Sequence, residues 1–329
     1  MIKVNKPMNE PTLRENLTQK GEQNTGWGQV TGYMHPAYAG SLSEFGTPRE
    51  LPGCGGWLLE RAIPGTGSTD AMGCYPLFAC CDWSQLERDL VDLEGKLVSV
   101  TIVADPFGNH DRQLLERCFD TVSVIKKHYA ADLTALPDAI VSKHHATYAR
   151  KAMTNVMVQV CQKPIELLDE WVSLYHSLIE RHNIRGIRAF SRKSFEKQLA
   201  VPGLVALRAE REGVPVAIDL YYIQGDTAYA HLIACSPLGY QLRASYALKW
   251  RAILHFTGKV RWINWGGGAG ISVSDTDGLA VFKKGWATCT RPAYFCTKIL
   301  DKVKYREIVR ARGLEHSSYF PAYRDGEFS

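Results

Sequence analysis

A run of glycines followed by a lysine is the part of this sequence whose residue types and spacing best suit chemistry. The segment Trp262-Ile-Asn-Trp-Gly-Gly-Gly-Ala-Gly270 is followed, after a polar stretch, by Asp277-Gly-Leu-Ala-Val-Phe-Lys-Lys-Gly-Trp286. Consecutive glycines let a backbone adopt positive φ and approach a ligand with no Cβ in the way. A lysine just beyond such a turn can place its ammonium group beside whatever that backbone holds. The sequence therefore predicts a site formed by Gly266, Gly267, Gly268 and Lys283. The alternatives are an irregular turn at the end of a strand and a solvated lysine on an amphipathic helix.

Other motifs that could carry chemistry are absent or incomplete. A dinucleotide fingerprint needs Gly-x-Gly-x-x-Gly near the start of a βαβ unit, but the glycine run is followed by Ile271 close to the end of the chain. Gly65-Thr-Gly-Ser68 lacks the lysine of a P-loop, and no Gly-x-Ser-x-Gly elbow or His-Glu-x-x-His helix occurs. His144 and His145 are adjacent, so they point to different faces of a helix and make a poor metal pair. We expect no metal site.

Length and composition indicate an ordinary globular protein. A chain of 329 residues favours two domains. With 45% hydrophobic and 22% charged residues it has the composition of a soluble protein with a core. The net charge of +5 permits an anionic substrate or a nucleic-acid contact without requiring one. The sequence contains no uninterrupted window of 18 apolar residues, so no membrane span is predicted. The polar segment 1–25 lacks the apolar core of a signal peptide, and we expect it to be a flexible leader.

The cysteines favour a reducing compartment. Nine are scattered along the chain without a Cys-x-x-Cys pair, at positions 54, 74, 80, 81, 118, 161, 235, 289 and 296. Several lie in apolar, strand-like contexts, so we interpret them as buried free thiols rather than as a disulfide framework or a zinc site. The sequence therefore predicts a cytoplasmic protein.

Hydrophobic periodicity predicts an α/β (α+β) fold with a mixed, mostly antiparallel sheet flanked by helices. Three strands within 204–234 are joined by short turns, as in an antiparallel meander. Strands are expected at 56–63, 75–80, 97–103, 121–125, 156–160, 204–209, 216–223, 228–234 and 292–299, and a further strand runs into the three glycines. Helices are expected at 83–93, 112–119, 142–153, 165–181, 191–199, 240–256 and 301–312, and a short amphipathic segment carries Phe282 and Lys283.

Two halves of similar character follow one another without a visible sequence repeat. The best boundary is the segment 131–141, which contains Pro137. We therefore predict a leader over 1–25, an N-terminal domain over 26–138, a C-terminal domain over 139–314 and a tail over 315–329.

The order of these segments resembles a known family. The pattern Trp-Gly-Gly-Gly, then Asp-Gly-Leu, then Phe-Lys-x-Gly-Trp is similar to the C-terminal signature of Fem-like and related GNAT-superfamily acyltransferases. The segment 143–151 resembles the family's basic helix, and 165–181 resembles its long helix. The resemblance covers about 140–309 and is weaker over 27–140, where Fem-like proteins carry a second, degenerate GNAT-like domain. It implies two GNAT-like domains in tandem and an acyltransferase activity.

The resemblance also implies roles for individual residues. Lys283 is expected to stabilise the oxyanion that develops during acyl transfer, and Phe282 to shape the pocket. His231 is the candidate general base, because an imidazole titrates near neutral pH; a structural histidine within the sheet is the alternative. Asp219 and Asp277 are weaker candidates, and Asp277 alternatively caps the helix that carries Lys283.

The acyl donor is left open between acyl-CoA and aminoacyl-tRNA. Acetyl-CoA-dependent GNAT enzymes hold the pyrophosphate on a glycine-rich loop at a helix N-terminus, and only Gly239 matches that loop here. Fem-like transferases lack the loop and use aminoacyl-tRNA, but those of the peptidoglycan type often carry a coiled-coil arm, for which no heptad run exists here. Basic residues such as Lys143 and Arg150 are candidates for binding donor or acceptor phosphates, or they form a solvated surface.

Three functions therefore remain. The leading hypothesis is an N-acyltransferase that moves an acetyl or longer acyl group from acyl-CoA to an amine. The acceptor amine would belong to a small molecule or a sugar-nucleotide. That molecule would be a precursor of the cell envelope, of a polysaccharide or of a secondary metabolite. The second is a Fem-like, aminoacyl-tRNA-dependent transferase that forms an amide bond, and the third is a non-catalytic binding protein that retains the fold. None of the three calls for a tightly bound cofactor or for DNA as a partner.

Overall fold

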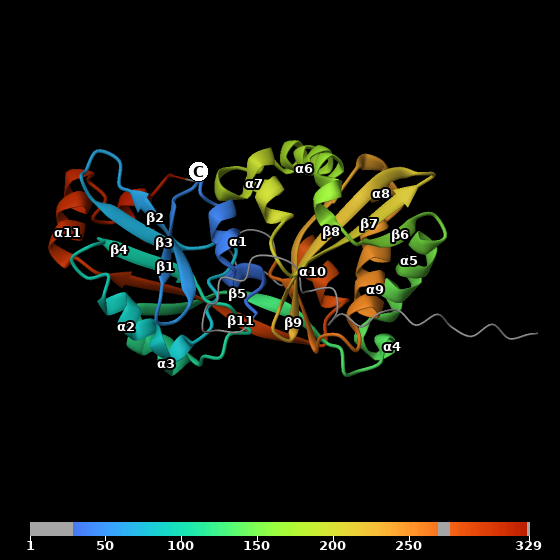
Figure 1. Cartoon of the computed structure of the whole chain (residues 1–329), viewed down its shortest axis with the longest axis horizontal. Helices are drawn as coiled ribbons and strands as arrows, with labels where there is room; N and C mark the ends of the chain where they lie inside the picture. Colours follow the sequence, from blue (N-terminus) through green and yellow to red (C-terminus); the bar gives the residue numbers. More distant parts are fainter. Residues whose placement is uncertain (1–28, 269–276, 328–329) are drawn as a thin grey trace, which may run out of the picture.

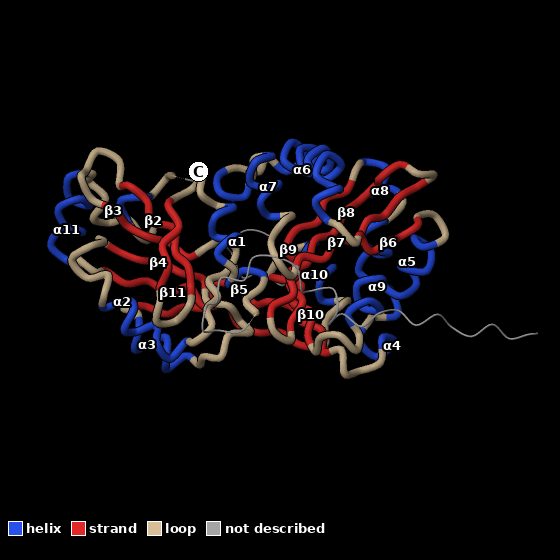
Figure 2. The backbone as a smooth tube through the Cα atoms, in the orientation of Figure 1, coloured by secondary structure: helices blue, strands red, loops and turns tan. Residues whose placement is uncertain are grey.

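The computed structural model describes residues 29–268 and 277–327. These residues form one mixed sheet of eleven strands with helices packed on it. The strand order is β1-β2-β3-β4-β11-β5-β10-β9-β8-β7-β6, and helices cover both of its faces (Figures 1 and 2). Within these residues the neighbouring strands are antiparallel, except for the parallel pairs β3–β4 and β9–β10. The predicted leader 1–25 and the stretch 269–276, which includes Ala269 and Gly270 of the glycine-rich segment, lie outside the described residues.

The strands are β1 Thr47–Leu51, β2 Gly56–Ala62, β3 Thr69–Gly73, β4 Ser99–Val103, β5 Thr121–Asp132, β6 Met157–Cys161, β7 Leu204–Arg211, β8 Val214–Gln224, β9 Thr227–Cys235, β10 Trp262–Gly266 and β11 Cys289–Ile299. The α-helices are α1 Pro36–Ser41, α2 Leu86–Val91, α3 Arg112–Cys118, α4 Pro137–Ile140, α5 Lys143–Met153, α6 Leu168–His182, α7 Arg192–Gln198, α8 Pro237–Gln241, α9 Ala244–Phe256, α10 Gly278–Lys284 and α11 Lys302–Ala311. Short 3₁₀ turns occur at Gly32–Met34, Trp83–Gln85, Pro164–Leu167, Gly186–Arg188 and Ala322–Arg324.

The two halves of the chain repeat one order of elements. In the N-terminal half the meander β1-β2-β3 is followed by α2, the parallel strand β4, α3 and β5. In the C-terminal half the meander β7-β8-β9 is followed by α8 and α9, the parallel strand β10, α10 and β11. The repeat is invisible in the sequence because it lies in the order and pairing of the strands rather than in the identities of their residues.

The last strand of each half pairs with the other half. β11 follows α10 along the chain but lies between β4 and β5, with which it is antiparallel along its length. β5 follows α3, and its end pairs with β10 of the C-terminal half. Figure 1 shows β5 and β11 crossing the middle of the elongated molecule, with α11 at the end formed by the N-terminal half. The proposed boundary at 138/139 stays a prediction, but α11, β11 and the 315–327 segment pack with the N-terminal half.

Separate apolar clusters hold the helices on the sheet. α5 and α9 pack on one face of the C-terminal half, where Ala244, Ala247, Leu248, Ala252 and Ile253 of α9 are fully buried. These residues recur at helical spacing, so they form one apolar stripe. On the other face, α6 and α7 share a second cluster with α1. α2 and α3 cover the N-terminal half through a third cluster, and α11 packs on a fourth.

A buried carboxyl group also connects the halves. Asp105, just after β4, accepts hydrogen bonds from Tyr229 Oη on β9 (2.7 Å) and Gln224 Nε2 on β8 (3.0 Å). Burial raises the pKa of Asp105 to about 6, against the opposing effect of these hydrogen bonds. The contact therefore belongs to the packing between the halves rather than to an open site.

Most predicted elements are confirmed, with three corrections. The strand predicted at 75–80 is wrong: this apolar segment makes one isolated bridge, Phe78 to Ala104, and is apolar because it is buried between clusters. The helix predicted over 240–256 is two helices, because Arg243 adopts a left-handed conformation with φ of 56°. The strands β1 and β3 were not predicted, since neither sequence alternates apolar and polar residues.

The cysteines are all free thiols, but not all are buried. Cys289 is exposed, and Cys81 and Cys161 are partly exposed, while the other six are buried as expected. Among the described residues, no helix is both long enough and apolar enough to cross a membrane.

The segment after α11 is fixed to the sheet by a buried ion pair. Arg324 donates from Nε and Nη2 to the two carboxylate oxygens of Asp70 on β3, at 2.6 and 2.7 Å, and the two side chains are 5% and 4% exposed. Beside it, Tyr323 Oη hydrogen-bonds Ser99 Oγ of β4 at 2.8 Å. The predicted tail is thus an integral part of the N-terminal half.

Replacing one partner of this pair should destabilise the fold. Asp70→Asn removes the buried counter-charge of the Arg324 guanidinium and leaves only the partly exposed Glu327, and breaking a buried pair in this way generally costs about 3 kcal/mol. We expect that loss in the free energy of unfolding, measured by urea denaturation. Glu116→Gln, which removes an exposed partner of Arg112 on α3, is the control and should leave the unfolding midpoint unchanged. Equal midpoints for both variants would contradict the anchoring role.

Candidate active site

The glycine run ends β10, and a capped helix returns Lys283 to it. β10 ends at Gly266, whose φ of 77° lies in the left-handed region that favours glycine. Asp277 begins α10 as its N-cap, with Oδ1 accepting from the backbone N–H groups of Leu279 (2.8 Å) and Ala280 (2.9 Å). Lys283, in the last turn, donates from Nζ to the carbonyl oxygen of Gly267 at 2.6 Å. The predicted association of the glycines with Lys283 is therefore present in the structure.

A second lysine reaches the same glycines from β5. Lys126 Nζ donates to the carbonyl oxygen of Gly268 at 3.2 Å. A Cβ on Gly267 would lie 2.9 Å from Lys126 Cδ, and a Cβ on Gly268 would lie 2.5 Å from Asp277 Oδ2. These glycines are thus needed for close packing against side chains of the protein itself. The carbonyl oxygens of Gly267 and Gly268 accept hydrogen bonds from the ammonium groups of Lys283 and Lys126. At these two residues the backbone therefore binds cations through its carbonyl oxygens.

The ammonium group of Lys283 has an unusual environment for a lysine. Burial and, to a smaller extent, the nearby ammonium groups of Lys249 and Lys126 lower its pKa to about 7. The carboxylates of Asp219 and Asp277 oppose this effect. Lys283 therefore changes its protonation state near neutral pH, although the residue as a whole is partly exposed.

Beneath Lys283 lies a buried ion pair. Lys249 of α9 donates to Asp219 Oδ2 of β8 at 2.8 Å, and the two side chains are 7% and 1% exposed. Tyr221 donates from Oη to the same carboxylate oxygen at 2.5 Å. The Lys249 ammonium also lies over the rings of Tyr221 and Trp265, at 5.2 and 5.1 Å from their centroids. Asp219, a weaker candidate from the sequence, thus acts on Lys283 through its charge and through Lys249.

A histidine that the sequence analysis did not single out also belongs to this site. His128 of β5 is buried, and its Nδ1 lies 3.1 Å from Asn264 Oδ1 of β10. Burial and the charge of Lys283 lower the pKa of His128 to about 3, so its imidazole is neutral at physiological pH. Asn264 Oδ1 also accepts from the N–H of Gly266 at 2.9 Å, which fixes the turn. His128 and Asn264 therefore support the glycine segment from the side of β5.

His231, the predicted general base, lies in a different environment. Its Nδ1 lies 3.1 Å from Tyr33 Oη and its Nε2 lies 3.0 Å from Gln198 Oε1, so both ring nitrogens have partners. The ring packs among Tyr33, Tyr38 and Tyr222, in the cluster beneath α6 and α7. Burial alone lowers the pKa of His231 to about 3, without a contribution from Lys283. The structure thus does not bring His231 together with Lys283, and it favours the structural alternative.

Phe282 connects α10 to the helices of the C-terminal half. Its ring packs 5.0 Å from that of Tyr246 on α9 and 5.6 Å from that of His145 on α5. His145 in turn places Nε2 3.0 Å from the carbonyl oxygen of Phe282, and a Cβ on Gly285 would collide with the His145 ring at 2.2 Å. These contacts hold α10 against α5. Phe282 therefore fixes the position of Lys283, whereas its predicted part in shaping a pocket stays a prediction.

The remaining predicted site residues lie outside this cluster. Lys143 and Arg150 are exposed on α5. Gly239 lies in α8, where its N–H donates to Ser236 Oγ at 3.0 Å and a Cβ would lie 2.2 Å from the carbonyl oxygen of Val216. Close packing against β8 is thus sufficient reason for a glycine there. No group of three or more His, Cys, Asp or Glu residues is placed to hold a metal ion in the described part of the chain.

The arrangement suits the stabilisation of negative charge. Two ammonium groups, from α10 and β5, converge at the end of β10 in a partly buried setting, where they act more strongly than in water. Sequence reasoning found Lys283 but missed Lys126, His128 and Lys249. One signal was available for Lys249, which stands on the apolar stripe of a helix between Leu248 and Ala252.

Comparison with known proteins gives the class of fold. No family model matches the chain, and neither does any curated protein. Solved structures do match it. FemX is 13% identical with a TM-score of 0.60, covering 83% of this chain and 93% of FemX. The C-terminal domain of a putative lysylphosphatidylglycerol synthetase from Agrobacterium fabrum is 14% identical with a TM-score of 0.57, covering 87% of this chain and 94% of that one. L-PGS from Bacillus licheniformis is 15% identical with a TM-score of 0.51, covering 86% and 98%.

The chain therefore shares its fold with FemX and with the C-terminal domain of the putative lysylphosphatidylglycerol synthetase. The predicted resemblance and the predicted mixed, mostly antiparallel sheet are both confirmed.

The pKa of Lys283 can be measured directly. In protein labelled with ¹³C at lysine Cε, one resonance should titrate with a midpoint near pH 7 and should vanish in Lys283→Met. Lys126→Ala removes a neighbouring positive charge, so it should move this midpoint to higher pH. Lys284→Ala, at the exposed neighbouring position, is the matched control and should leave the midpoint in place. A Lys283 midpoint close to 10.5 would refute the buried setting described here.

Proposed function

We infer that this protein is an aminoacyl-tRNA-dependent transferase that moves an aminoacyl group onto an amine. The observation that carries the proposal is the Lys283 ammonium, held against Gly267 at the end of β10 within a Fem-like fold. Acyl transfer passes through a tetrahedral intermediate with a developing oxyanion, and a fixed cation at that point is often the largest catalytic contribution. Transferases named among the structures with this fold include a putative lysylphosphatidylglycerol synthetase, whose name indicates an aminoacylated product.

The helix that follows β9 argues against acyl-CoA as the donor. A pyrophosphate-binding helix N-terminus needs free backbone N–H groups. In α8 the first position is Pro237, which has no N–H, and the N–H of Gly239 already donates to Ser236 Oγ. The space beside Gly239 is filled by the backbone of β8. These features favour a donor that does not need a pyrophosphate-binding site at this helix, and we therefore propose aminoacyl-tRNA rather than acyl-CoA.

The chemistry follows from the position of Lys283. The acceptor amine attacks the ester carbonyl carbon of the aminoacyl-tRNA, and the Lys283 ammonium donates a hydrogen bond to the oxygen that becomes negative. The C–N bond forms, the C–O bond to the ribose breaks, and the ribose oxygen takes up the proton that the amine loses. Because an adjacent oxyanion favours the charged form of the lysine, Lys283 stays protonated in the transition state even with a ground-state pKa of about 7. Lys126 adds positive charge beside the same backbone.

Removing the ammonium should reduce the rate of transfer more than substrate binding. Lys283→Met is expected to lower kcat by about 100-fold or more, with little change in KM, since it removes an interaction made mainly in the transition state. The assay uses total tRNA charged with radiolabelled amino acids, and follows label on glycinamide and, separately, on phosphatidylglycerol vesicles. Lys284→Met is the control and should retain activity.

Each outcome of this assay decides between the candidate functions. Label on glycinamide, lost in Lys283→Met, supports the proposal, whereas label on phosphatidylglycerol alone would show transfer to a hydroxyl group and contradict the proposed amine acceptor. Transfer from acetyl-CoA or longer acyl-CoAs, with none from charged tRNA, would instead establish an acyl-CoA-dependent transferase. Unchanged transfer in Lys283→Met would remove the assigned role of Lys283.

A further inference from the structure

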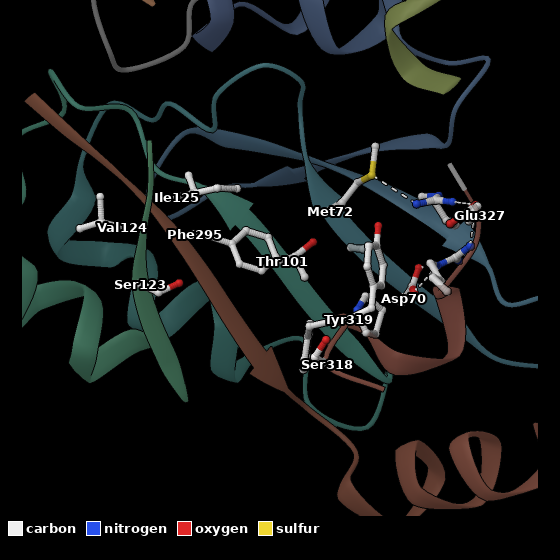
Figure 3. A pocket seen from close by; sticks show the side chains of 15 residues that line it. Asp70, Met72, Thr101, Ser123, Val124, Ile125, Phe295, Ser318, Tyr319 and Glu327 are labelled. Carbon is white, nitrogen blue, oxygen red and sulfur yellow. Dashed lines mark hydrogen bonds and ion pairs between the residues drawn. The ribbon is translucent and has the colours of Figure 1, made fainter. Parts of the chain in front are cut away.

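A cavity lies in the N-terminal half, and its lining does not include Lys283. It has a volume of about 450 Å³, within the range of small-molecule sites, and lies on the sheet face formed by β3, β4, β11 and β5 (Figure 3). Its body is lined mainly by apolar side chains: Met72, Ile125, Phe295, Phe320 and Pro321. Arg61, Asp70, Arg324 and Glu327 gather at one end.

The outer wall of this cavity is a segment that follows α11. Residues 318–321 pass over the sheet, and the segment is fixed immediately afterwards by Tyr323 and Arg324. Arg324 binds Asp70 through two hydrogen bonds, so the wall is retained even if the residues beyond it move. The cavity is therefore a fixed feature of the fold rather than a gap under a loose end.

Two arginines converge at the charged end, and Glu327 bridges them. Arg61 on β2 pairs with Glu327 Oε1, and Arg324 Nη1 donates to the same oxygen at 3.1 Å. The Arg61 side chain is 12% exposed and that of Glu327 is 30% exposed. Burial and the charge of Arg324 lower the pKa of Arg61, while the carboxylate of Glu327 opposes this effect.

The two acidic partners differ in how they are held. Asp70 is 4% exposed on a central strand, and both of its oxygens accept from Arg324. Glu327 lies three positions after the buried Arg324, and its side chain is 30% exposed. An anion entering the cavity can thus take the place of Glu327 beside Arg61 without breaking the Asp70–Arg324 pair.

We propose that this cavity binds an organic anion with an apolar body, whose carboxylate takes the place of Glu327 at Arg61 and Arg324. The aromatic and aliphatic walls accommodate the hydrocarbon part, and the guanidinium groups match a planar carboxylate with paired donors. Glu327 then acts as an internal competitor that occupies the arginines when the cavity is empty. The proposal does not depend on transferase activity, because the residues of the two sites do not overlap.

Direct calorimetric titration tests the proposal, with octanoate as the probe. Octanoate should bind the full-length protein, whereas 1-octanol, which has no charge, and acetate, which has no apolar body, should bind more weakly or not at all. Glu327→Gln removes the competing carboxylate and should tighten octanoate binding by about fivefold, the size of effect expected for a partly exposed ion pair. Glu307→Gln on α11 is the matched control and should leave the affinity unchanged.

Two further variants distinguish the body of the cavity from its charged end. Arg61→Gln should abolish the preference for octanoate over 1-octanol. Ser123→Trp, at an exposed position on the cavity side of β5 opposite Phe295 (Figure 3), should fill the cavity and prevent binding of both probes. The proposal is wrong if octanoate fails to bind both the native protein and Glu327→Gln. It is also wrong if Glu327→Gln leaves the octanoate affinity unchanged, or if octanoate and 1-octanol bind equally well.

Discussion

The antiparallel ladder between β5 and β11 is the interaction on which the rest of the structure depends. It runs from the pair Cys289–Ala130 to the pair Thr297–Thr121 and joins two half-sheets that would otherwise end in open edges. Unpaired edge strands expose backbone donors and acceptors, so their mutual pairing stabilises both halves. Because α10 leads directly into β11, the same ladder fixes the position of the helix that carries Lys283.

The candidate active site is assembled from both halves as a result. Lys126 and His128 belong to β5, which follows the helices of the N-terminal half, while Lys249, Gly267 and Lys283 come from the C-terminal half. Three ammonium groups in one partly buried region repel one another, and the carboxylates of Asp219 and Asp277 offset this repulsion only in part. Burial of the Lys283 ammonium is the larger effect, and this repulsion adds to it, so that the pKa of Lys283 is lowered to about 7.

The local parts of this arrangement could be read from the sequence, and the distant parts could not. The strand before the glycines, the Asp277 cap and the position of Lys283 on a short helix all follow from residues within a single segment. Lys126 and His128 were missed because the charged stretch Lys126-Lys127-His128 interrupts the apolar run of β5, so the strand was predicted to end at 125. The role of His231 was uncertain for a related reason, since its partners, Tyr33 and Gln198, are remote in sequence.

The exchange of β5 and β11 also bears on how such a protein can change over evolutionary time. Two halves with the same order of elements suggest modules that could be duplicated, lost or recombined independently. Here each half ends in a strand that completes its neighbour, so a chain that inherits only one of them leaves a half-sheet unfinished. Neither half therefore forms a complete sheet without the last strand of the other, so loss of one half would leave the other with an unpaired edge.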